Sequence, residues 1–263
     1  MTMKWPDWGL NSLGQRALRS LRHSQRPVGD FLFPWECVLC GLDGPELAGP
    51  LCAGCQAKIL DDAIQARSLA CPRCALPVGP FAVRQEGCTR CQGRSLGFDA
   101  ATMLGLYEGP LRDLCLLLKR ESNAWLASWL GGMMVQVCKP DLGRLPSSTW
   151  IIPIPLHWAR SLSRGYNQAE ALARSLAHHL DLELHQPLRR VKPTGYLFTK
   201  SSRERMAAMR EVFQVRHPGQ LRDRTILLVD DIMTTGATCG AASRVLKRAG
   251  ARYIMAAVLG RAI

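Results

Sequence analysis

The sequence predicts an α/β protein with a parallel sheet that carries helices on both faces, preceded by a small metal-binding module. After residue 97, apolar strand-like runs alternate with amphipathic helical segments. Before it, eight of the 11 cysteines form four Cys-x-x-Cys pairs. With 263 residues and 47% hydrophobic residues, the chain can bury a sizeable core, which excludes a fibrous or wholly disordered protein.

The texture of the chain predicts three segments. Residues 1–30 are a basic extension with a weak amphipathic pattern. Residues 31–96 consist of short pieces interrupted by Gly and Pro around the cysteine pairs, with few periodic apolar runs. Residues 97–263 hold the alternating pattern. We therefore expect metal to stabilise the middle segment, and a hydrophobic core to stabilise the last one.

The pattern of the last segment predicts four strands and three helices. We expect buried strands over 98–107, 150–155, 225–229 and 253–259. The helices are expected over 111–137, which Gly131 and Gly132 could interrupt, over 167–180 with Asn167 as its cap, and over 237–249. Since strands and helices alternate, the sheet should be parallel.

The four cysteine pairs predict two metal sites of four thiolates each. Intervals of 11, 15 and 13 residues separate the pairs. Two residues between thiolates let both sulfurs reach one tetrahedral ion, and a closed Cys₄ shell leaves no open position for chemistry. We therefore expect two structural Zn²⁺ ions. Short loops favour sequential pairing, although a crossed arrangement stays open. The predicted ligands are Cys37, Cys40, Cys52, Cys55, Cys71, Cys74, Cys88 and Cys91.

Three glycines and three further cysteines accompany these pairs. Glycines near the Cys-x-x-Cys knuckle turns suit a backbone that needs positive φ or close approach, and these are Gly41, Gly54 and Gly93. Cys115 and Cys138 are expected to be core thiols. Cys239 also lies outside the pattern.

A Thr- and Gly-rich loop follows the strand that starts at Thr225, in the run TILLVDDIMTTGAT. Backbone N–H groups and hydroxyls at a helix N-terminus bind anions, so this loop predicts a phosphate site. Its residues are Thr234, Thr235, Gly236, Ala237 and Thr238. No Walker A loop and no G-x-G-x-x-G fingerprint occurs in the chain.

Two adjacent carboxylates, Asp230 and Asp231, precede the loop. Beside a phosphate they would be unfavourable unless they bind ribose hydroxyls, Mg²⁺ or a developing positive charge. The combination therefore indicates a sugar phosphate.

The run LLVDDIMTTGAT resembles the phosphoribosyl pyrophosphate (PRPP) signature of type I phosphoribosyltransferases. Together with FLFPWECVLCG, the cysteine pairs, YEGPLRDL with Lys119 and IIPIPLHWARSLSRGYNQAEALA, it resembles the ComF/GntX family. The resemblance covers about residues 31–263. It implies a double zinc ribbon over 31–96 and a type I phosphoribosyltransferase domain over 97–263.

The resemblance also implies roles for particular residues. Asp230 and Asp231 would face the ribose as catalytic carboxylates, and Thr234 to Thr238 would hold its 5′-phosphate. Arg160 and Arg164 would lie toward the pyrophosphate, with Mg²⁺ accompanying PRPP. Asn167 and Gln168 are further polar candidates there; Asn167 could instead serve only as a helix cap, and the arginines as solvated surface.

The stretch before the loop departs from the family pattern. By our alignment Leu197, Ala208 and Glu211 replace the family's Gln, Asn and Gly, while Arg205 and Phe213 remain. In type I transferases a loop near this segment closes over the reacting centre. The missing polar residues therefore weaken the prediction of turnover more than the prediction of phosphate binding.

Charge adds a nucleic-acid interpretation. The formal net charge is +13, and two zinc-bound Cys₄ sites would reduce it to about +9. Residues 189–224 hold ten Lys/Arg against three Asp/Glu. This segment could follow a nucleic-acid backbone, with Tyr196 and Phe198 stacking on bases, or form a solvated face.

Three functions follow from these observations. The first is a PRPP-dependent phosphoribosyltransferase, which is a glycosyltransferase. The second, which the resemblance supports, is DNA uptake and utilisation in natural competence, with single-stranded DNA and the uptake machinery as partners. The third is a PRPP sensor without turnover. No apolar run reaches 18 residues, and four arginines interrupt the first 30 residues, where a secretory signal would need an unbroken apolar stretch. We therefore expect a cytoplasmic protein without a transmembrane segment.

Overall fold

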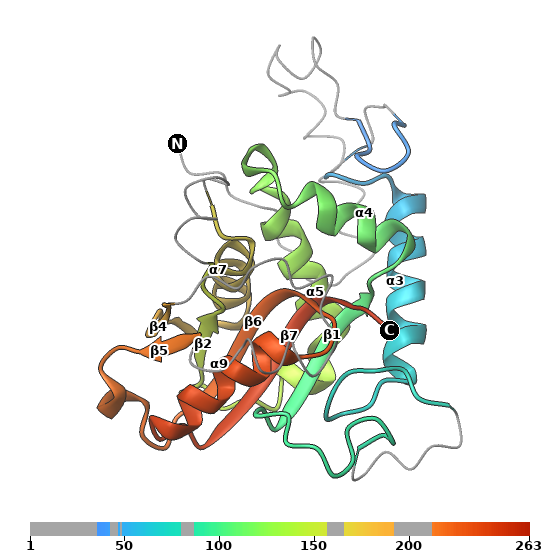
Figure 1. Ribbon diagram of the computed structural model, residues 1–263. Helices are drawn as coiled ribbons and strands as arrows, with labels where there is room; N and C mark the ends of the chain where they lie inside the picture. Colours follow the sequence, from blue (N-terminus) through green and yellow to red (C-terminus); the bar gives the residue numbers. More distant parts are fainter. Residues whose placement is uncertain (1–35, 43–46, 48, 80–86, 157–165, 192–211) are drawn as a thin grey trace. The chain divides into compact units, whose positions relative to one another are not determined.

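The computed structural model describes residues 36–42, 47, 49–79, 87–156, 166–191 and 212–263 (Figure 1). The chain divides into two compact units, residues 1–52 and 53–263. The predicted boundaries near residues 30 and 96 stay predictions. None of the described helices is long and apolar enough to cross a membrane.

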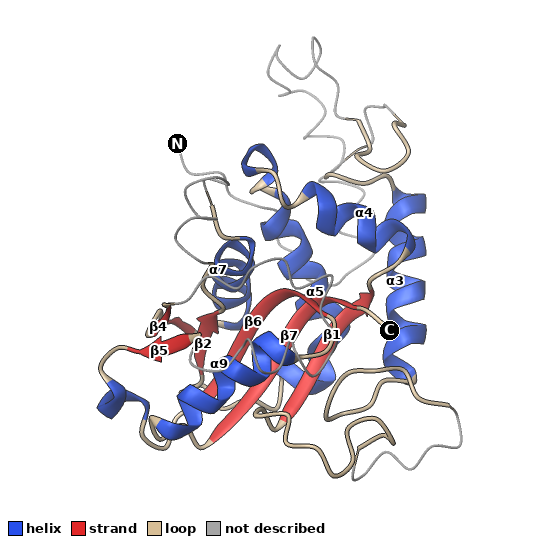
Figure 2. Ribbon diagram, in the orientation of Figure 1, coloured by secondary structure: helices blue, strands red, loops and turns tan. Residues whose placement is uncertain are grey.

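A five-stranded parallel sheet forms the centre of the larger unit, in the order β1-β7-β6-β2-β3 (Figure 2). The parallel sheet and its four predicted strands are confirmed, and β3 is an addition. The central strands β6 and β7 are apolar and mostly buried, as expected for strands covered on both faces. The strands are β1 (Ala100–Leu106), β2 (Trp150–Pro153), β3 (Glu183–Leu184), β6 (Thr225–Met233) and β7 (Tyr253–Arg261).

Helices cover both faces of this sheet, which confirms the predicted layers. Helix α9 (Ala237–Arg248) contacts β6 and β7 and lies in front of the sheet in Figure 1. Helices α5 (Leu126–Leu142) and α7 (Gln168–Leu180) pack on each other and on the opposite face. The core on the α9 side joins apolar residues of both layers, including Leu246, Leu228 and Ile254.

The single helix predicted over 111–137 is wrong. The segment forms α4 (Gly109–Leu117), a 3₁₀ turn (Glu121–Asn123) and then α5. The helix is not interrupted at Gly131 or Gly132. A Cβ at Gly131 would stand 2.6 Å from Ser175 Cβ, so this glycine permits close approach of α7. Gly131 therefore serves the packing of two helices and does not interrupt α5.

Helix α3 (Ala53–Ser68) was not predicted. It buries Ile59, Ala63 and Ala66 and contacts β1, so part of the cysteine-rich segment does use apolar packing. Two of its three buried side chains are alanines, which gave a weak helical period in the sequence. Gly54 belongs to this helix and has no positive φ, unlike Gly41 and Gly93, whose positive φ was expected.

A short antiparallel ribbon completes the described fold. It pairs β4 (Leu188–Arg190) with β5 (Phe213–Val215). A 3₁₀ turn (Pro218–Leu221) then leads to β6. Helix α9 contacts β5, and Phe213 is buried in the same core as the α9 side chains. The ribbon therefore extends the apolar layer beyond the parallel sheet.

Candidate functional site

The Thr/Gly loop lies where β6 ends and α9 begins. Strand β6 continues to Met233, four residues beyond the predicted end, so only Thr234–Gly236 connect the two elements. Gly236 precedes the helix with φ of 75°, a left-handed conformation that glycine adopts without strain. The Thr235 hydroxyl accepts a hydrogen bond from the Ala237 amide at 3.3 Å. Thr234 and Thr235 are exposed, so their polar groups are accessible to an anion.

The two carboxylates belong to the last part of β6. Asp230 Oδ1 accepts a hydrogen bond from the Asp231 amide at 3.0 Å, and Asp231 Oδ1 accepts one from the Ile232 amide at 2.8 Å. Burial, followed by the neighbouring charge of Asp231, raises the pKa of Asp230 well above its usual range. The pair therefore favours a ligand that brings positive charge or hydroxyl donors.

Tyr107, directly after β1, and Cys115 of α4 are affected by the charge of this edge. Burial is the largest cause of the raised pKa of Tyr107, and the charge of Asp231 adds to it. Asp231 likewise raises the pKa of the buried Cys115 thiol after burial itself, whereas Lys119 opposes the shift. Lys119 and Asp231 thus both act electrostatically on Cys115. Cys115 is buried, as expected.

The second cysteine cluster joins Cys71, Cys74, Cys88 and Cys91, all of them buried. The sulfur–sulfur distances are 3.7 Å between Cys71 and Cys91, 3.6 Å between Cys74 and Cys88, and 3.8 Å between Cys88 and Cys91. A tetrahedron with Zn–S bonds of about 2.3 Å has edges of about 3.8 Å. The cluster therefore fits a structural Zn²⁺.

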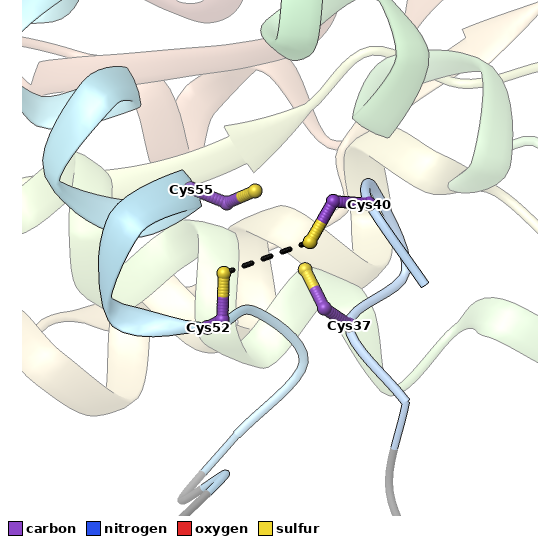
Figure 3. Close-up of side chains that lie close together, drawn as sticks. All are labelled: Cys37, Cys40, Cys52 and Cys55. Atoms are coloured by element: carbon purple, nitrogen blue, oxygen red, sulfur yellow. Dashed lines mark hydrogen bonds between the residues drawn. The ribbon is translucent and has the colours of Figure 1, made fainter. Parts of the chain in front are cut away.

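The first cluster joins Cys37, Cys40, Cys52 and Cys55, whose ligand atoms lie within 4.8 Å of one another. Figure 3 shows the four sulfur atoms turned toward a common centre, and Cys40 Sγ lies 3.7 Å from Cys52 Sγ. The sequential pairing is thus confirmed for both clusters. Cys37 is buried, Cys40 is exposed and the other two are partly buried.

In each cluster the turns favour the thiolate form of one cysteine, whereas burial raises the pKa of Cys74 and Cys91 in the second cluster. Burial opposes ionisation of Cys37, but hydrogen bonds from the backbone of Cys52, Cys40 and Leu39 outweigh it and lower its pKa to about 6. Cys88 is similar: burial opposes ionisation, yet hydrogen bonds lower its pKa to about 7. A thiolate is the form that binds zinc, so the turns are suited to metal ligation.

Comparisons with known proteins agree with this arrangement. The phosphoribosyl transferase domain family matches residues 162–262. Competence protein F of Haemophilus influenzae is 28% identical over 237 residues, which cover 88% of this chain and 98% of that protein. The chain is therefore similar to competence protein F over most of its length, and it carries a phosphoribosyl transferase domain.

Two further relatives extend the comparison. A DNA utilization protein YhgH of Salmonella typhi is 28% identical over 234 residues, covering 88% of this chain and 98% of that protein. An adenine phosphoribosyltransferase of Mycobacterium marinum is 52% identical over 40 residues, covering 15% of this chain and 22% of that protein. The ComF-like relatives thus span both the cysteine-rich and the phosphoribosyltransferase parts.

The remaining ComF/GntX candidate residues have different outcomes. Arg160 and Arg164 lie outside the described residues, and so do Leu197, Arg205, Ala208, Glu211, Tyr196 and Phe198. Asn167 caps α7: its Oδ1 accepts from the Ala169 amide at 3.1 Å and its Nδ2 donates to the Ile154 carbonyl at 3.1 Å. Asn167 therefore acts as a helix cap, which was one of its two expected roles. Gln168 is buried, with its Nε2 3.5 Å from the Lys119 carbonyl.

Arg261, at the end of β7, is a polar residue of this ComF-like site that sequence reasoning missed. Its side chain is only 4% exposed. Nε donates to the Cys74 carbonyl at 3.0 Å, and Nη1 donates to the carbonyls of Met233 at 2.8 Å, Thr234 and Ala262 at 2.6 Å. An arginine near the chain end carries no local motif, so no sequence signal marked it.

A cleft of about 790 Å³ at the opposite edge of the sheet was also missed. Ala100, Thr225 and Tyr253, where three strands begin, contribute to its lining. Arg224 lies over the Trp150 ring at 4.7 Å, and that ring stacks on His185. We name this feature the arginine cleft. Its arginines are Arg144, Arg222, Arg224 and Arg252.

Carboxylates balance only part of the charge in the arginine cleft. Asp141 is held by Arg67 at 2.8 Å and by the Thr102 hydroxyl at 2.7 Å. Asp223 lies 3.8 Å from Arg222, and both are exposed. Among the described residues, the other three arginines of the cleft form no ion pair. The cleft therefore offers positive charge to an anion.

Proposed function

We propose that this ComF-like protein binds PRPP or a related phosphorylated ribose, together with Mg²⁺, in the service of DNA uptake and utilisation. The observation that carries the proposal is the succession, at one strand end, of two carboxylates, an exposed threonine loop and a helix N-terminus. Ligands of open α/β sheets bind at this end of the strands. Zinc-binding thiols need a reducing compartment, so the cytoplasm is the proposed place of action.

In this proposal each part of the ligand meets groups of matching chemistry. The 5′-phosphate accepts hydrogen bonds from the amides and hydroxyls of Thr234 to Thr238, where the dipole of α9 favours negative charge. The ribose hydroxyls donate to Asp230 and Asp231. Arg160 and Arg164 pair with the pyrophosphate through their planar guanidinium groups. Lys119 adds positive charge near the acidic pair.

The acidic pair also fits Mg²⁺, which prefers carboxylate oxygens and substrate phosphates as ligands. Two adjacent carboxylates, one of them with a strongly raised pKa, form a donor set that a cation would stabilise. When bound, the ion would neutralise charge on the pyrophosphate. Asp230 and Asp231 would orient the ribose, and a bound cation would favour the ionised form of Asp230.

Two activities are compatible with this binding site. In a transferase, the bond between ribose C1 and a pyrophosphate oxygen breaks, pyrophosphate leaves with the electron pair, and an acceptor lone pair forms the new bond to C1. Asp230 and Asp231 would stabilise the positive charge that develops on the ribose, so positioning and electrostatics carry the rate. A PRPP sensor would bind the same ligand and stop before bond cleavage.

Calorimetric titration of the zinc-loaded protein with PRPP, with and without Mg²⁺, tests the proposal. We expect saturable binding that requires Mg²⁺ and that Asp231→Ala weakens at least about 100-fold, about 2.7 kcal/mol. Asp61→Ala, an exposed change on α3, is the matched control and should bind as the parent does. Equal affinity in the Asp231→Ala protein would refute the site. Release of pyrophosphate on addition of nucleobases then separates a transferase from a sensor.

The arginine cleft favours a second function, binding of a nucleic-acid strand through its phosphates. Arginine pairs bidentately with phosphate, and Tyr253 adds an aromatic ring to the lining. The names of the relatives, competence and DNA utilisation, agree with this function. In the proposal, the strand and the sugar phosphate occupy opposite edges of one sheet.

Fluorescence anisotropy of a labelled single-stranded oligonucleotide, measured across a salt series, tests this second function. Affinity should fall steeply and linearly on a log–log plot as salt rises, because counterions are released. Changing Arg144, Arg224 and Arg252 together to Gln should reduce both the affinity and the slope. A salt-independent affinity, or an unchanged slope in the triple variant, would refute phosphate binding in the cleft.

A further inference from the structure

Arg261 forms a direct connection between the second cysteine cluster and the Thr/Gly loop. Its Nε binds the carbonyl of Cys74, a cluster ligand, whereas its Nη1 binds the carbonyls of Met233 and Thr234 at the start of the loop. A guanidinium group is planar and rigid, so the relative positions of these carbonyls are fixed through it. One side chain therefore spans a metal knuckle and a ligand loop.

Arg261 is a buried cation that binds backbone carbonyls. A buried cation is normally paired with a carboxylate, because an unpaired charge is costly to bury. Here the contacts of the side chain among the described residues are backbone carbonyls, four in number. The Cys74 carbonyl belongs to the knuckle, and the Met233 and Thr234 carbonyls lie at the start of the loop. The hydrogen bonds of Arg261 therefore require the folded conformation of both segments.

The knuckle that contains Cys71 and Cys74 also binds the sheet at a second point, so two contacts fix its position relative to the sheet. The Ala101 amide of β1 donates to the Pro72 carbonyl at 3.1 Å. After the cluster, the chain at Gly97 passes so close to α9 that a Cβ there would stand 2.5 Å from the Gly240 carbonyl oxygen. Phe98 then lies beside Gly236, 3.6 Å from where a Cβ would be. The cluster and the loop thus share a packed boundary.

We propose that Arg261 is a positioning residue through which the second zinc cluster sets the conformation of the Thr/Gly loop. Zinc holds the knuckle, the knuckle holds Arg261, and Arg261 holds the first carbonyls of the loop. The ligand half of this inference rests on the proposed function. Because coupling between two sites is reciprocal, sugar-phosphate binding at the loop must in turn strengthen zinc binding at the second cluster.

Hydrogen exchange of the zinc-loaded protein tests the positioning role without any ligand. Arg261→Lys keeps the positive charge but lacks the planar guanidinium group with its several N–H donors. In this variant we expect amides 234–238 to exchange roughly tenfold faster, while amides 226–229 of β6 stay protected. Arg67→Lys is the matched control, since Arg67 binds Thr102 and Asp141 instead. Unchanged exchange of the loop in Arg261→Lys would overturn the positioning role.

Zinc release to a chelator, followed with and without PRPP and Mg²⁺, tests the coupling. In the parent protein we expect PRPP to slow the release of one of the two ions about tenfold, with the first cluster as internal reference. Arg261→Lys should lose this protection. Equal release rates with PRPP in a protein that calorimetry shows to bind it would overturn the coupling. Absent PRPP binding would refute the proposed function, while the exchange experiment would still decide the role of Arg261.

Discussion

The two edges of the parallel sheet differ in charge and in construction. At the edge where β6 ends, Asp230 and Asp231 stand beside a loop of hydroxyls and amides. At the edge where the strands begin, four arginines line the arginine cleft, and one of them, Arg224, lies over the Trp150 ring. The acidic edge suits a ligand that brings its own cation and hydroxyls, and the basic edge suits bare phosphates. One sheet therefore has an acidic edge and a basic edge.

The second cysteine cluster contacts residues of both edges. Pro72, inside its first knuckle, contributes to the lining of the arginine cleft, and the Cys74 carbonyl binds Arg261 at the end of β7. The largest expected effect comes from this cluster. Cys71→Ser should lower the zinc content from two ions to one and weaken binding at both edges, since a structural zinc contributes on the order of 10 kcal/mol to folding. Metal analysis, thermal unfolding and both binding assays measure it.

The first cluster supplies the control for this prediction. Cys37→Ser removes a ligand of the same chemistry and should also lose one zinc. We expect it to leave the unfolding midpoint of residues 53–263 and both binding affinities close to those of the parent. If the two serine variants unfold at the same temperature and bind equally, the second cluster has no special role in supporting the two edges.

A glycine substitution should affect the acidic edge alone. A Cβ at Gly240 would stand 2.4 Å from the Leu96 carbonyl oxygen, a backbone atom that cannot move aside cheaply. Gly240→Ala should therefore cost about 2–3 kcal/mol of unfolding free energy. It should also weaken PRPP binding through displacement of α9, with little change in oligonucleotide binding. Urea unfolding and the two binding assays check this.

Gly54→Ala is the matched control for that substitution. Gly54 lies in α3 with nothing within 4 Å of its Cβ position. Alanine is the better helix former, so a gain of up to about 1 kcal/mol is expected. Equal losses of stability in Gly54→Ala and Gly240→Ala, or no loss in Gly240→Ala, would show that close approach to the Leu96 carbonyl is not the reason for glycine at position 240.

The sequence predicted the acidic edge far better than the basic edge. The loop and the carboxylates are contiguous from Asp230 to Thr238, so a local motif records them. The strands and the cysteine ligands also have local signals. A buried strand appears as a short apolar run, and a pair of metal ligands appears as two cysteines separated by two residues. The sheet and both clusters were therefore predicted correctly.

Features that depend on tertiary contact were not predictable. The arginine cleft combines Arg144, Arg224 and Arg252, which come from three separate connections. Arg261 acquires its partners only when β7 lies beside β6. Gly131 looked like a helix break because the sequence does not reveal that α7 packs against it. In each case the signal is a distance between segments far apart in the chain.

Asp230 gives the acidic edge a pH dependence. Its pKa is raised in the folded protein, by burial first and by Asp231 second, above the value of an unfolded Asp. Such a group contributes stability that is fully present below the unfolded pKa and is lost as pH rises through the folded pKa. Asp230→Asn should therefore stabilise the protein at pH 7 and lose this advantage toward pH 4. The Asn oxygen can still accept from the Asp231 amide.

Thermal unfolding of the parent and Asp230→Asn proteins between pH 4 and pH 8 measures this difference. Asp61→Asn, a change at an exposed position of α3, is the matched control. Addition of Mg²⁺ and PRPP should favour the parent over Asp230→Asn, because the carboxylate then has its partner. A constant difference between the two proteins at all pH values would mean that Asp230 does not carry the raised pKa.

The smallest expected effect concerns a single arginine of the basic edge. Arg252 is exposed and forms no ion pair among the described residues, so its charge is available to a phosphate. Arg252→Gln should weaken oligonucleotide binding by a few-fold and reduce the salt slope by about 1, whatever the base sequence. Arg174→Gln on α7, where Arg174 pairs with Glu170 at 2.6 Å, is the control and should leave the slope unchanged. Because PRPP binds at the opposite edge in our proposal, its affinity should be the same in both variants, and a loss of PRPP affinity in Arg252→Gln would contradict the separation of the two edges.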